Sequence, residues 1–176
     1  VLPEDFAALG VDDSKKLSEK KREELYALIM EAAIAVGLGA EDNLTIDRVN
    51  ILEATKLAMR SAVEEASARL AEREGEGAKI GHLLIDALTL PGIAIPQSGI
   101  VKGDEKCLSV AAASIVAKVT RDRLMARCHE AYPAYSFDRN KGYGTKAHYQ
   151  AIAAAGLCPI HRRSFCRGAR LPEGGV

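Results

Sequence analysis

The stretch Ile80-Gly81-His82-Leu83-Leu84-Ile85-Asp86-Ala87-Leu88 decides the fold class of this 176-residue chain. At its centre, Leu83-Leu84-Ile85 is a short apolar run, and the turn-forming sequence Glu74-Gly75-Glu76-Gly77 precedes it. A short apolar run between turn signals is typical of a buried strand. We therefore predict a strand over residues 80–88 and a second, shorter strand at Ile100-Val101.

Four helices are predicted around these strands, over about 18–36, 47–73, 109–131 and 145–156. Ser18 and Thr145 are capping residues at helix starts, and Gly37 and Gly156 are stop signals at helix ends. Strands that alternate with helices indicate an α/β layered fold. The residues expected on the buried faces of the first two helices are Leu25, Leu28, Ile29, Ala32 and Val36, and then Ile51, Ala54, Thr55, Ala58, Ala62 and Ala66.

Length and composition indicate one globular domain over residues 1–176, with residues 157–176 as a C-terminal tail. No apolar run is long enough for a transmembrane helix, and the first residues do not resemble a signal peptide. The chain lacks an initiator Met, so we expect it to begin inside a longer product. The four cysteines have no zinc-type spacing, which favours reduced thiols and a cytoplasmic location.

Charge is distributed unevenly along the chain, although the net charge is zero. Residues 101–170 contain 13 Lys and Arg against 5 Asp and Glu, whereas residues 1–100 contain 11 against 18. A basic half can attract phosphate groups while the whole chain stays neutral. The alternative is that these charges only solvate helix faces, and the asymmetry alone does not choose between the two.

Two carboxylates stand at the predicted strand ends, where ligands gather in α/β folds. Asp86 interrupts an apolar strand, so its burial requires a partner, which is either a Lys or backbone cap or a divalent cation. Asp104 follows Gly103 after the next strand, where it is either a turn or cap residue or a second ligand of the same ion. Neither residue decides the matter alone.

Seven short motifs occur in one order, and together they resemble the bacterial ribonuclease HII family across nearly the whole chain. They are Asp13-Ser14-Lys15-Lys16-Leu17-Ser18, Asn50-Ile51-Leu52-Glu53-Ala54-Thr55, Leu84-Ile85-Asp86, Lys102-Gly103-Asp104, Ala111-Ala112-Ala113-Ser114-Ile115-Val116-Ala117-Lys118, Lys141-Gly142-Tyr143-Gly144-Thr145 and His161-Arg162-Arg163-Ser164-Phe165. The resemblance implies a ribonuclease H-like fold, with a mixed sheet flanked by helices and a helical C-terminal part.

The resemblance also implies a two-metal site. The family holds two Mg²⁺ or Mn²⁺ ions with four carboxylates, and Asp86 and Asp104 match the third and fourth of them. The first two lie in a Gly-x-Asp-Glu-Ala-Gly-Arg-Gly segment on an early strand, which this sequence does not contain. We therefore expect the first strand or strands to be missing and the chain as it stands to have little or no activity.

Other motif positions match substrate contacts of the family. Tyr143 matches the tyrosine that packs on the sugar after the ribonucleotide, and Ser14, Lys15, Lys16 and Asn50 match phosphate contacts. Lys118 either approaches the same phosphate or pairs with Asp104 or Asp122, and both alternatives stay open. We predict that His148 and His161 are packed against neighbours rather than catalytic, and that Arg162 and Arg163 reach the duplex backbone.

The implied function is endonucleolytic cleavage of the RNA strand of RNA/DNA hybrids, and of duplex DNA on the 5′ side of single ribonucleotides. The products are a 3′-hydroxyl and a 5′-phosphate, and the cellular role is removal of misincorporated ribonucleotides and RNA primers. We expect a monomer that binds these nucleic acids and no membrane. The alternative from another class is a non-catalytic duplex-binding domain.

Overall fold

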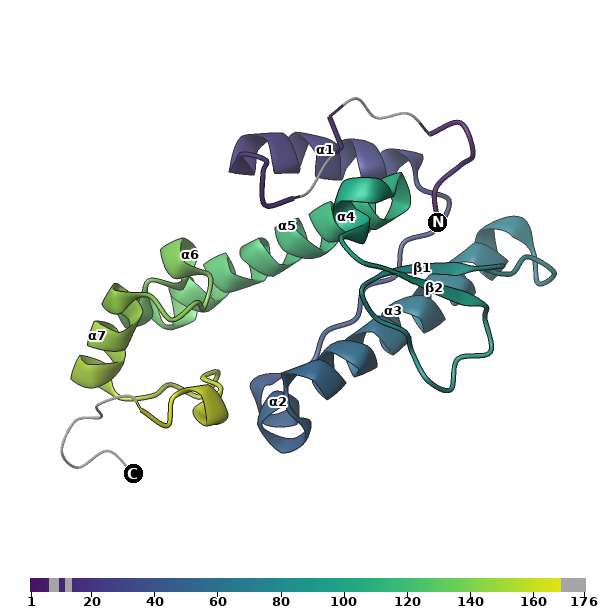
Figure 1. Cartoon of the computed structure of the whole chain (residues 1–176). Helices are drawn as coiled ribbons and strands as arrows, with labels where there is room; N and C mark the ends of the chain where they lie inside the picture. The colour runs from purple at the N-terminus through teal and green to yellow at the C-terminus, as the bar shows by residue number, and fades with distance from the viewer. Residues whose placement is uncertain (7–9, 12–13, 169–176) are drawn as a thin grey trace. The chain divides into compact units, whose positions relative to one another are not determined.

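The computed structural model describes residues 1–6, 10–11 and 14–168. The chain divides into two compact units, the first of residues 1–40 and 55–119 and the second of residues 41–54 and 120–176. Figure 1 follows the elements along the chain. They are α1 (Glu19–Ala32), α2 (Asn43–Val49), α3 (Ile51–Glu74), β1 (Leu83–Asp86), β2 (Gln97–Ile100), α4 (Gly103–Lys106), α5 (Leu108–Ala131), the 3-10 helix η1 (Pro133–Tyr135), α6 (Phe137–Asn140), α7 (Lys146–Ala155) and the 3-10 helix η2 (Arg163–Phe165).

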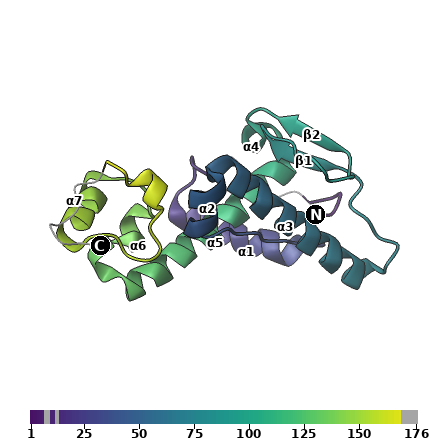
Figure 2. The ribbon, with the colours of Figure 1, turned by 90° about the horizontal axis from the view of Figure 1, so that it is seen from below.

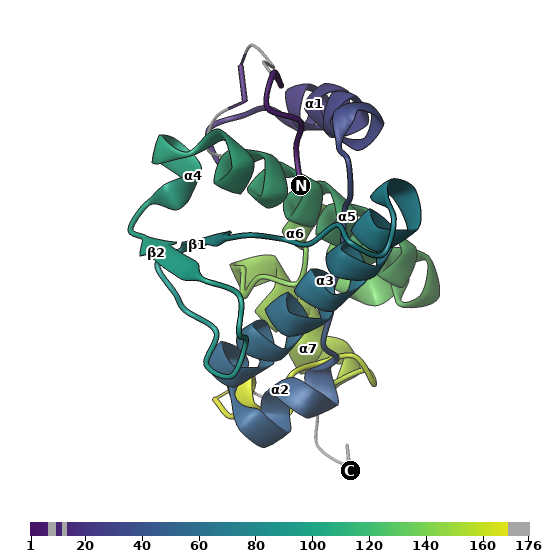
Figure 3. The same ribbon diagram turned by 90° about the vertical axis from the view of Figure 1, so that its right-hand side faces the viewer.

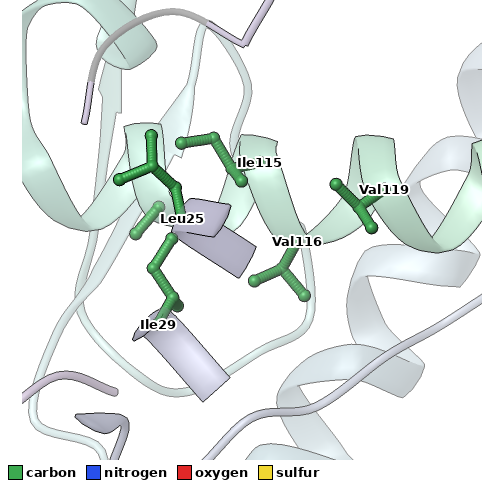
Figure 4. Packing of buried hydrophobic residues seen from close by; sticks show 6 residues of the cluster. Leu25, Ile29, Ile115, Val116 and Val119 are labelled. Carbon is green, nitrogen blue, oxygen red and sulfur yellow. The ribbon is translucent and has the colours of Figure 1, made fainter. Parts of the chain in front are cut away.

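Helix α1 begins at the predicted cap, where Ser18 Oγ accepts a hydrogen bond from the Lys21 N–H at 3.2 Å. It buries Leu25 and Ile29 as predicted, and these side chains point toward the first half of α5 (Figure 4). The other partners in this core are Ala112, Ile115, Val116 and Val119. Leu28 is exposed, so the prediction that it lies on the buried face is wrong.

Helix α1 ends at Ala32, four residues before the predicted end at Val36. The following residues are drawn into tertiary hydrogen bonds instead, because the Ile34 N–H donates to Val1 O at 3.0 Å and Arg73 Nη1 donates to Ala33 O at 2.9 Å. The chain then crosses α3 at very close range. A Cβ on Gly37 would lie 1.9 Å from Ala62 O. Gly37 is therefore required for close backbone packing and not as a helix stop.

One predicted helix over residues 47–73 is two helices in the structure. Asn50 separates α2 from α3 with a φ of 74° and a ψ of 167°, a backbone conformation that residues other than glycine rarely adopt. Its Oδ1 accepts from the Leu52 and Glu53 N–H groups at 2.9 and 3.1 Å, so its side chain caps the start of α3. Ile51 is consequently exposed, which corrects its predicted burial, whereas Ala54 is buried as predicted.

The sheet of the described residues is the parallel pair β1–β2, with Leu83 opposite Gln97 and Asp86 opposite Ile100. Strand β1 is shorter than the predicted strand over residues 80–88, and β2 begins and ends earlier than the strand predicted at residues 100–101. The described residues contain no antiparallel strand, so the predicted mixed sheet is not observed among them. Leu83 and Ile85 alternate inward, and with Leu90 they form a core against Met59 and Val63 of α3. Figure 3 shows the ribbons of β1, β2 and α3. The alternation leaves Leu84 and Asp86 on the outer face.

The second unit is helical, as predicted for the C-terminal part of the chain. Thr145 caps α7 through the His148 N–H at 3.2 Å, and Gly156 ends it, as predicted. Residues of α5, η1, α6 and α7 share a core of Met125, Tyr135, Phe137 and Ile152 (Figure 2). Asp47 of α2 binds η2 by accepting from the Arg163 N–H at 2.8 Å and the Ser164 N–H at 3.0 Å. Within the described residues, no helix combines the length and apolar character that membrane crossing requires.

Candidate functional site

In the first unit, Asp86 is hydrogen-bonded to the residue that precedes Asp104. Asp86 is the last residue of β1, and its Oδ1 accepts a hydrogen bond from the Gly103 N–H at 2.9 Å. Gly103 begins α4 and Asp104 follows it directly. A Cβ on Gly103 would lie 3.5 Å from Asp86 Cα, so the two backbones approach closely there. We call Asp86, Gly103, Asp104 and Lys15 the carboxylate corner.

The two carboxylates differ in burial, and the predicted burial of Asp86 is wrong. Asp86, predicted to be buried, occupies an outward position of the alternating strand and is exposed. Asp104 follows a turn but is only 8% exposed. The difference arises because β1 buries only alternate residues, and Asp86 is at an exposed position. In α4, by contrast, the first two residues, Gly103 and Asp104, are buried.

Lysines surround the corner. Lys15 Nζ lies 3.6 Å from Asp104 Oδ2, with the lysine side chain 78% exposed. Lys16 Nζ lies 3.4 Å from Glu105 Oε1, and Lys102 Nζ lies 3.7 Å from Glu105 Oε2. Ion pairs of such exposed lysines contribute only about 0–1 kcal/mol to stability. These ammonium groups can therefore exchange a carboxylate for a phosphate at small cost.

Ser14 differs from its lysine neighbours. It is 3% exposed, and its Oγ lies 2.8 Å from Ser114 Oγ of α5. Its carbonyl accepts from Arg22 Nη1 at 3.0 Å. Its side chain therefore attaches the lysine-bearing loop to α5, and its burial leaves little of the hydroxyl accessible to a phosphate. Asp13 of the same motif lies outside the described residues.

Lys118 lies on α5, half-buried, one turn after Ser114. Residues four apart share a helix face. The Ser14–Ser114 hydrogen bond thus brings the Lys15 loop to the α5 face that carries Lys118. The two alternatives for Lys118 stay open.

The corner suits a hard divalent cation in the chemistry of its donors, since carboxylate oxygens are the ligands that Mg²⁺ and Mn²⁺ prefer. Asp86 and Asp104 offer such oxygens, one exposed and one largely buried. No cluster of three or more His, Cys, Asp or Glu able to hold a metal occurs in residues 1–6, 10–11 and 14–168. The pair therefore supplies part of a ligand set.

The second unit holds Tyr143 in a loop that we call the tyrosine loop (Lys141-Gly142-Tyr143-Gly144). The Tyr143 side chain is 59% exposed, with the Arg121 guanidinium carbon 5.7 Å from its ring centroid. Gly142 has a φ of 77°, which strongly favours glycine. Burial lowers the pKa of Arg162, and the Arg121 charge lowers it further.

Asn140 and His148 hold the tyrosine loop from two sides. The buried Asn140 accepts from the Gly142 N–H through Oδ1 at 2.8 Å and from the Tyr143 N–H through its carbonyl at 2.8 Å. His148 Nδ1 lies 2.9 Å from Tyr143 O. His148 and His161 are both buried and packed, as predicted. Sequence reasoning missed Arg121 and Asn140. Asn140 carries a usable signal, because Asn before Lys-Gly is typical of a turn, whereas nothing marks Arg121, which lies 22 residues before Tyr143.

Asn50 lies in the second unit, whereas Ser14, Lys15 and Lys16 lie in the first. Its Oδ1 is used in capping α3. Capping explains why an Asn occupies this position without any nucleic acid. A phosphate contact by Asn50 would have to use its amide nitrogen.

Comparison with known proteins identifies the family. The family model described as ribonuclease HII matches residues 3–168. Curated relatives named ribonuclease HII are 49% identical in Bacillus subtilis strain 168, 51% in Ligilactobacillus salivarius strain UCC118 and 50% in Desulfitobacterium hafniense strain Y51, each over 165 residues. The match covers 94% of this chain and 60% of each relative. The chain belongs to the ribonuclease HII family.

Proposed function

We propose that this protein is an endonuclease that hydrolyses the RNA strand of RNA/DNA hybrids and cuts 5′ of single ribonucleotides in duplex DNA. The products are a 3′-hydroxyl and a 5′-phosphate. One observation carries the proposal: in a chain about half identical to proteins named ribonuclease HII, Asp86 and the residue before Asp104 are joined by a 2.9 Å hydrogen bond. This hydrogen bond supports a site in which the two acidic side chains act together beside exposed lysines.

Asp86 and Asp104 would hold divalent ions, Mg²⁺ or Mn²⁺, and we propose two of them. Bound ions supply Lewis-acid stabilisation of an in-line phosphodiester displacement. The Gly103 N–H fixes the orientation of the Asp86 carboxylate by donating a hydrogen bond to Oδ1. The other oxygen of this carboxylate, Oδ2, would then be the one to bind a metal ion. Lys15 balances the charge of Asp104, which limits repulsion between the two carboxylates before a cation binds.

Lys15 and Lys16 would bind phosphates of the duplex without reading bases. Their loop is attached to α5 by the Ser14–Ser114 hydrogen bond, so the backbone that carries the two lysine side chains has a fixed position on α5. Asn50 and Lys118 are proposed as further contacts with the duplex backbone. Exposed ammonium groups on a loop with a fixed backbone are better suited to the regularly spaced phosphates of a duplex than to one buried anion.

Tyr143 would pack against the sugar that follows the ribonucleotide. An exposed aromatic ring with an arginine over its face offers an apolar surface next to a phosphate-binding cation. The fixed backbone of the tyrosine loop makes the position of that ring reproducible. This arrangement supports discrimination by shape, because an added 2′-hydroxyl changes the outline of the sugar.

We further propose a single ribonuclease H-like domain over residues 1–176, with residues 157–176 as a tail, that acts as a monomer in the cytoplasm. Four free cysteines suit a reducing compartment. Asp86 and Asp104 would supply two carboxylates, and the proposed two-ion mechanism needs more ligands than these. We therefore expect the 176 residues by themselves to cut weakly.

The test uses two proteins. One is the 176-residue chain alone, and the other is a chimaera of the Bacillus subtilis relative, in which the 165-residue region that matches this chain is exchanged for the chain. Each is incubated with duplex DNA that contains one ribonucleotide, with and without Mn²⁺, and with an all-DNA duplex as the control substrate. We expect metal-dependent cutting 5′ of the ribonucleotide by the chimaera, and its loss in Asp86→Asn and Asp104→Asn. Duplex binding without metal-dependent cutting by the chimaera would favour the non-catalytic duplex-binding domain instead.

A further inference from the structure

A continuous line of polar contacts runs through the core of the second unit and ends at the tyrosine loop. The Cys158 N–H lies 2.9 Å from His161 Nδ1, His161 Nε2 lies 3.1 Å from His148 Nε2, and His148 Nδ1 lies 2.9 Å from Tyr143 O. Both histidines are only 5% exposed. We call this line the histidine relay (Cys158, His161, His148 and Tyr143).

The two ends of the histidine relay determine where its protons lie. A backbone N–H can only donate, so His161 Nδ1 accepts from Cys158 and the proton of the neutral His161 ring is on Nε2. A carbonyl oxygen can only accept, so His148 carries its proton on Nδ1 and has a bare Nε2. His161 Nε2–H then donates to His148 Nε2, and every polar atom of the line is satisfied.

Aromatic rings enclose the two histidines and limit their movement. The Tyr135 and His161 ring centroids are 4.8 Å apart in an edge-to-face contact, and those of Phe137 and His148 are 5.4 Å apart in another. Asn43 Nδ2 donates to His161 O at 3.0 Å, which fixes the backbone as well. The relay therefore joins a rigid core to the loop.

The Tyr143 side chain needs such an anchor. Its ring is exposed and lies 5.7 Å from the Arg121 guanidinium carbon, so the position of the ring depends largely on the backbone that carries it. Tyr143 O accepts from His148 Nδ1 and also from the Thr145 N–H at 2.8 Å. The histidine is the one of these two partners that reaches into the core.

We propose that His148 and His161 are positioning residues that fix the Tyr143 backbone through the neutral histidine relay. The part of this inference that concerns substrate rests on the proposed function, because only there does Tyr143 contact a sugar. The coupling between the histidines and the loop does not depend on it. Specificity for a ribonucleotide junction is thus determined in part by two buried side chains that do not touch the nucleic acid.

Charge state is part of this arrangement. A proton added to His148 would place two N–H groups against each other at 3.1 Å, and one added to His161 would turn Nδ1 away from the Cys158 N–H toward Cys158 O, now 3.3 Å away. Among the described residues, the titratable groups beside each ring include the other histidine, the Cys158 thiol and Tyr135, whose hydroxyl donates to Gly156 O at 3.0 Å. Burial also lowers the pKa of His161, which favours the neutral form of that ring near pH 7.

The first test reads the tautomers directly. Long-range ¹H–¹⁵N correlation spectra of the ¹⁵N-labelled 176-residue chain report which nitrogen of each histidine carries the proton, and His148→Asn and His161→Asn assign the signals. We expect an Nδ1–H tautomer for His148 and an Nε2–H tautomer for His161 at pH 7.5. The same tautomer for both rings, or a charged ring at that pH, would overturn the relay.

The second test measures the anchor. His148→Gln moves the side-chain amide away from Tyr143 O, whereas His148→Asn retains a donor close to the position of Nδ1. We expect the exchange rate of the Tyr143 amide hydrogen to rise about fivefold in His148→Gln, as for loss of one ordinary hydrogen bond, and to recover in His148→Asn. His82→Gln, at an exposed histidine of the first unit, is the matched control and should leave this rate unchanged. Equal exchange in wild type and His148→Gln would refute the positioning role.

The third test connects the relay to recognition. The affinities of the chimaera for a duplex with one ribonucleotide and for the all-DNA duplex are measured without metal. We expect His148→Gln to lower the ratio of the two affinities and His148→Asn to restore it. If the wild type shows no preference for the ribonucleotide, the proposed function fails while the exchange result still decides the coupling. A preserved ratio in His148→Gln would contradict the link to specificity.

Discussion

The carboxylate corner and the tyrosine loop are built in opposite ways. The corner is held by charge, with an exposed lysine 3.6 Å from the Asp104 carboxylate and an Asp86 carboxylate that keeps one oxygen uncommitted to Gly103. The tyrosine loop is held by neutral hydrogen bonds from two buried side chains, Asn140 and His148. Weak ion pairs leave room for a ligand to enter, whereas buried neutral hydrogen bonds fix a geometry before the ligand arrives.

The largest expected effect is on the cutting rate, which should depend on the carboxylate corner, whereas preference for a ribonucleotide should depend on the tyrosine loop. In the chimaera, Asp104→Asn should lower the cutting rate by more than about 100-fold, since even residues that only orient metal ligands cost 10–100-fold. Duplex affinity measured without metal should change little. Tyr143→Ala should instead lower the preference for a ribonucleotide junction while hybrids are still cut. Cutting rates and binding curves on both substrates check this, and similar losses on every substrate for the two variants would remove the distinction.

A second prediction concerns stability in the tyrosine loop. Asn140 is buried and binds Tyr135 O, the Gly142 N–H and the Tyr143 N–H, so Asn140→Ala should cost about 2–3 kcal/mol in free energy of unfolding. The matched control is Ser18→Ala, at an exposed helix cap with an ordinary φ of −65°, for which we expect about 1 kcal/mol. Urea unfolding measures both. Equal costs would mean that the loop is no more tightly built than an ordinary cap.

The contrast between the regions explains what sequence reasoning can and cannot find. Local signals predicted the caps Ser18 and Thr145, the end at Gly156 and the long α5 well, because each depends on neighbours in sequence. The burial of Asp86 was predicted wrongly, because a four-residue strand covered on one face buries only alternate positions.

Tertiary contacts account for the other differences. Asn50 splits a long helical pattern with a positive-φ residue that periodicity does not reveal. Helix α1 stops early because Val1 and Arg73, distant in sequence, capture the backbone that follows it. The placement of Asp86 and Asp104 after consecutive strands was expected from the strand pattern, whereas Arg121 over Tyr143 had no sequence signal at all.

A third prediction uses pH to weaken the tyrosine loop selectively. Burial lowers the pKa of His161, so the unfolded chain binds more protons than the folded chain below the ordinary histidine pKa of about 6.5. Stability from the neutral relay is then complete above about pH 6.5 and decreases as the pH falls through the lowered pKa. The urea midpoint should fall between pH 7 and pH 5.

The control for this pH effect is His161→Asn, which should flatten that part of the pH profile. The carboxyl pKa values of Asp42 and Asp47 are also lowered, by hydrogen bonds from Thr45 and Ser164 respectively. Their contribution is lost only at lower pH, below the ordinary carboxyl range, so it does not overlap the histidine window. A steeper profile in His161→Asn than in wild type would be the wrong sign for this account.

The smallest expected effect is at the corner. Lys15→Ala should change the free energy of unfolding by no more than about 1 kcal/mol, as for other exposed ion pairs. It should nevertheless reduce the salt dependence of duplex binding, lowering the slope of log affinity against log salt by about one. Binding titrations at several salt concentrations measure this slope. Lys20→Ala, at an exposed lysine of α1, is the comparison, and an identical slope for the two variants would exclude Lys15 from the phosphate contacts.

The most direct test of the central claim is a Mn²⁺ titration of the 176-residue chain, with free Mn²⁺ followed by its electron paramagnetic resonance signal. The account predicts that the chain binds Mn²⁺, that Asp86→Asn and Asp104→Asn each weaken binding by at least about tenfold, and that Glu105→Gln, next to Asp104, does not. Mn²⁺ binding that is equally strong in all four proteins would contradict the claim that Asp86 and Asp104 converge to hold the ion.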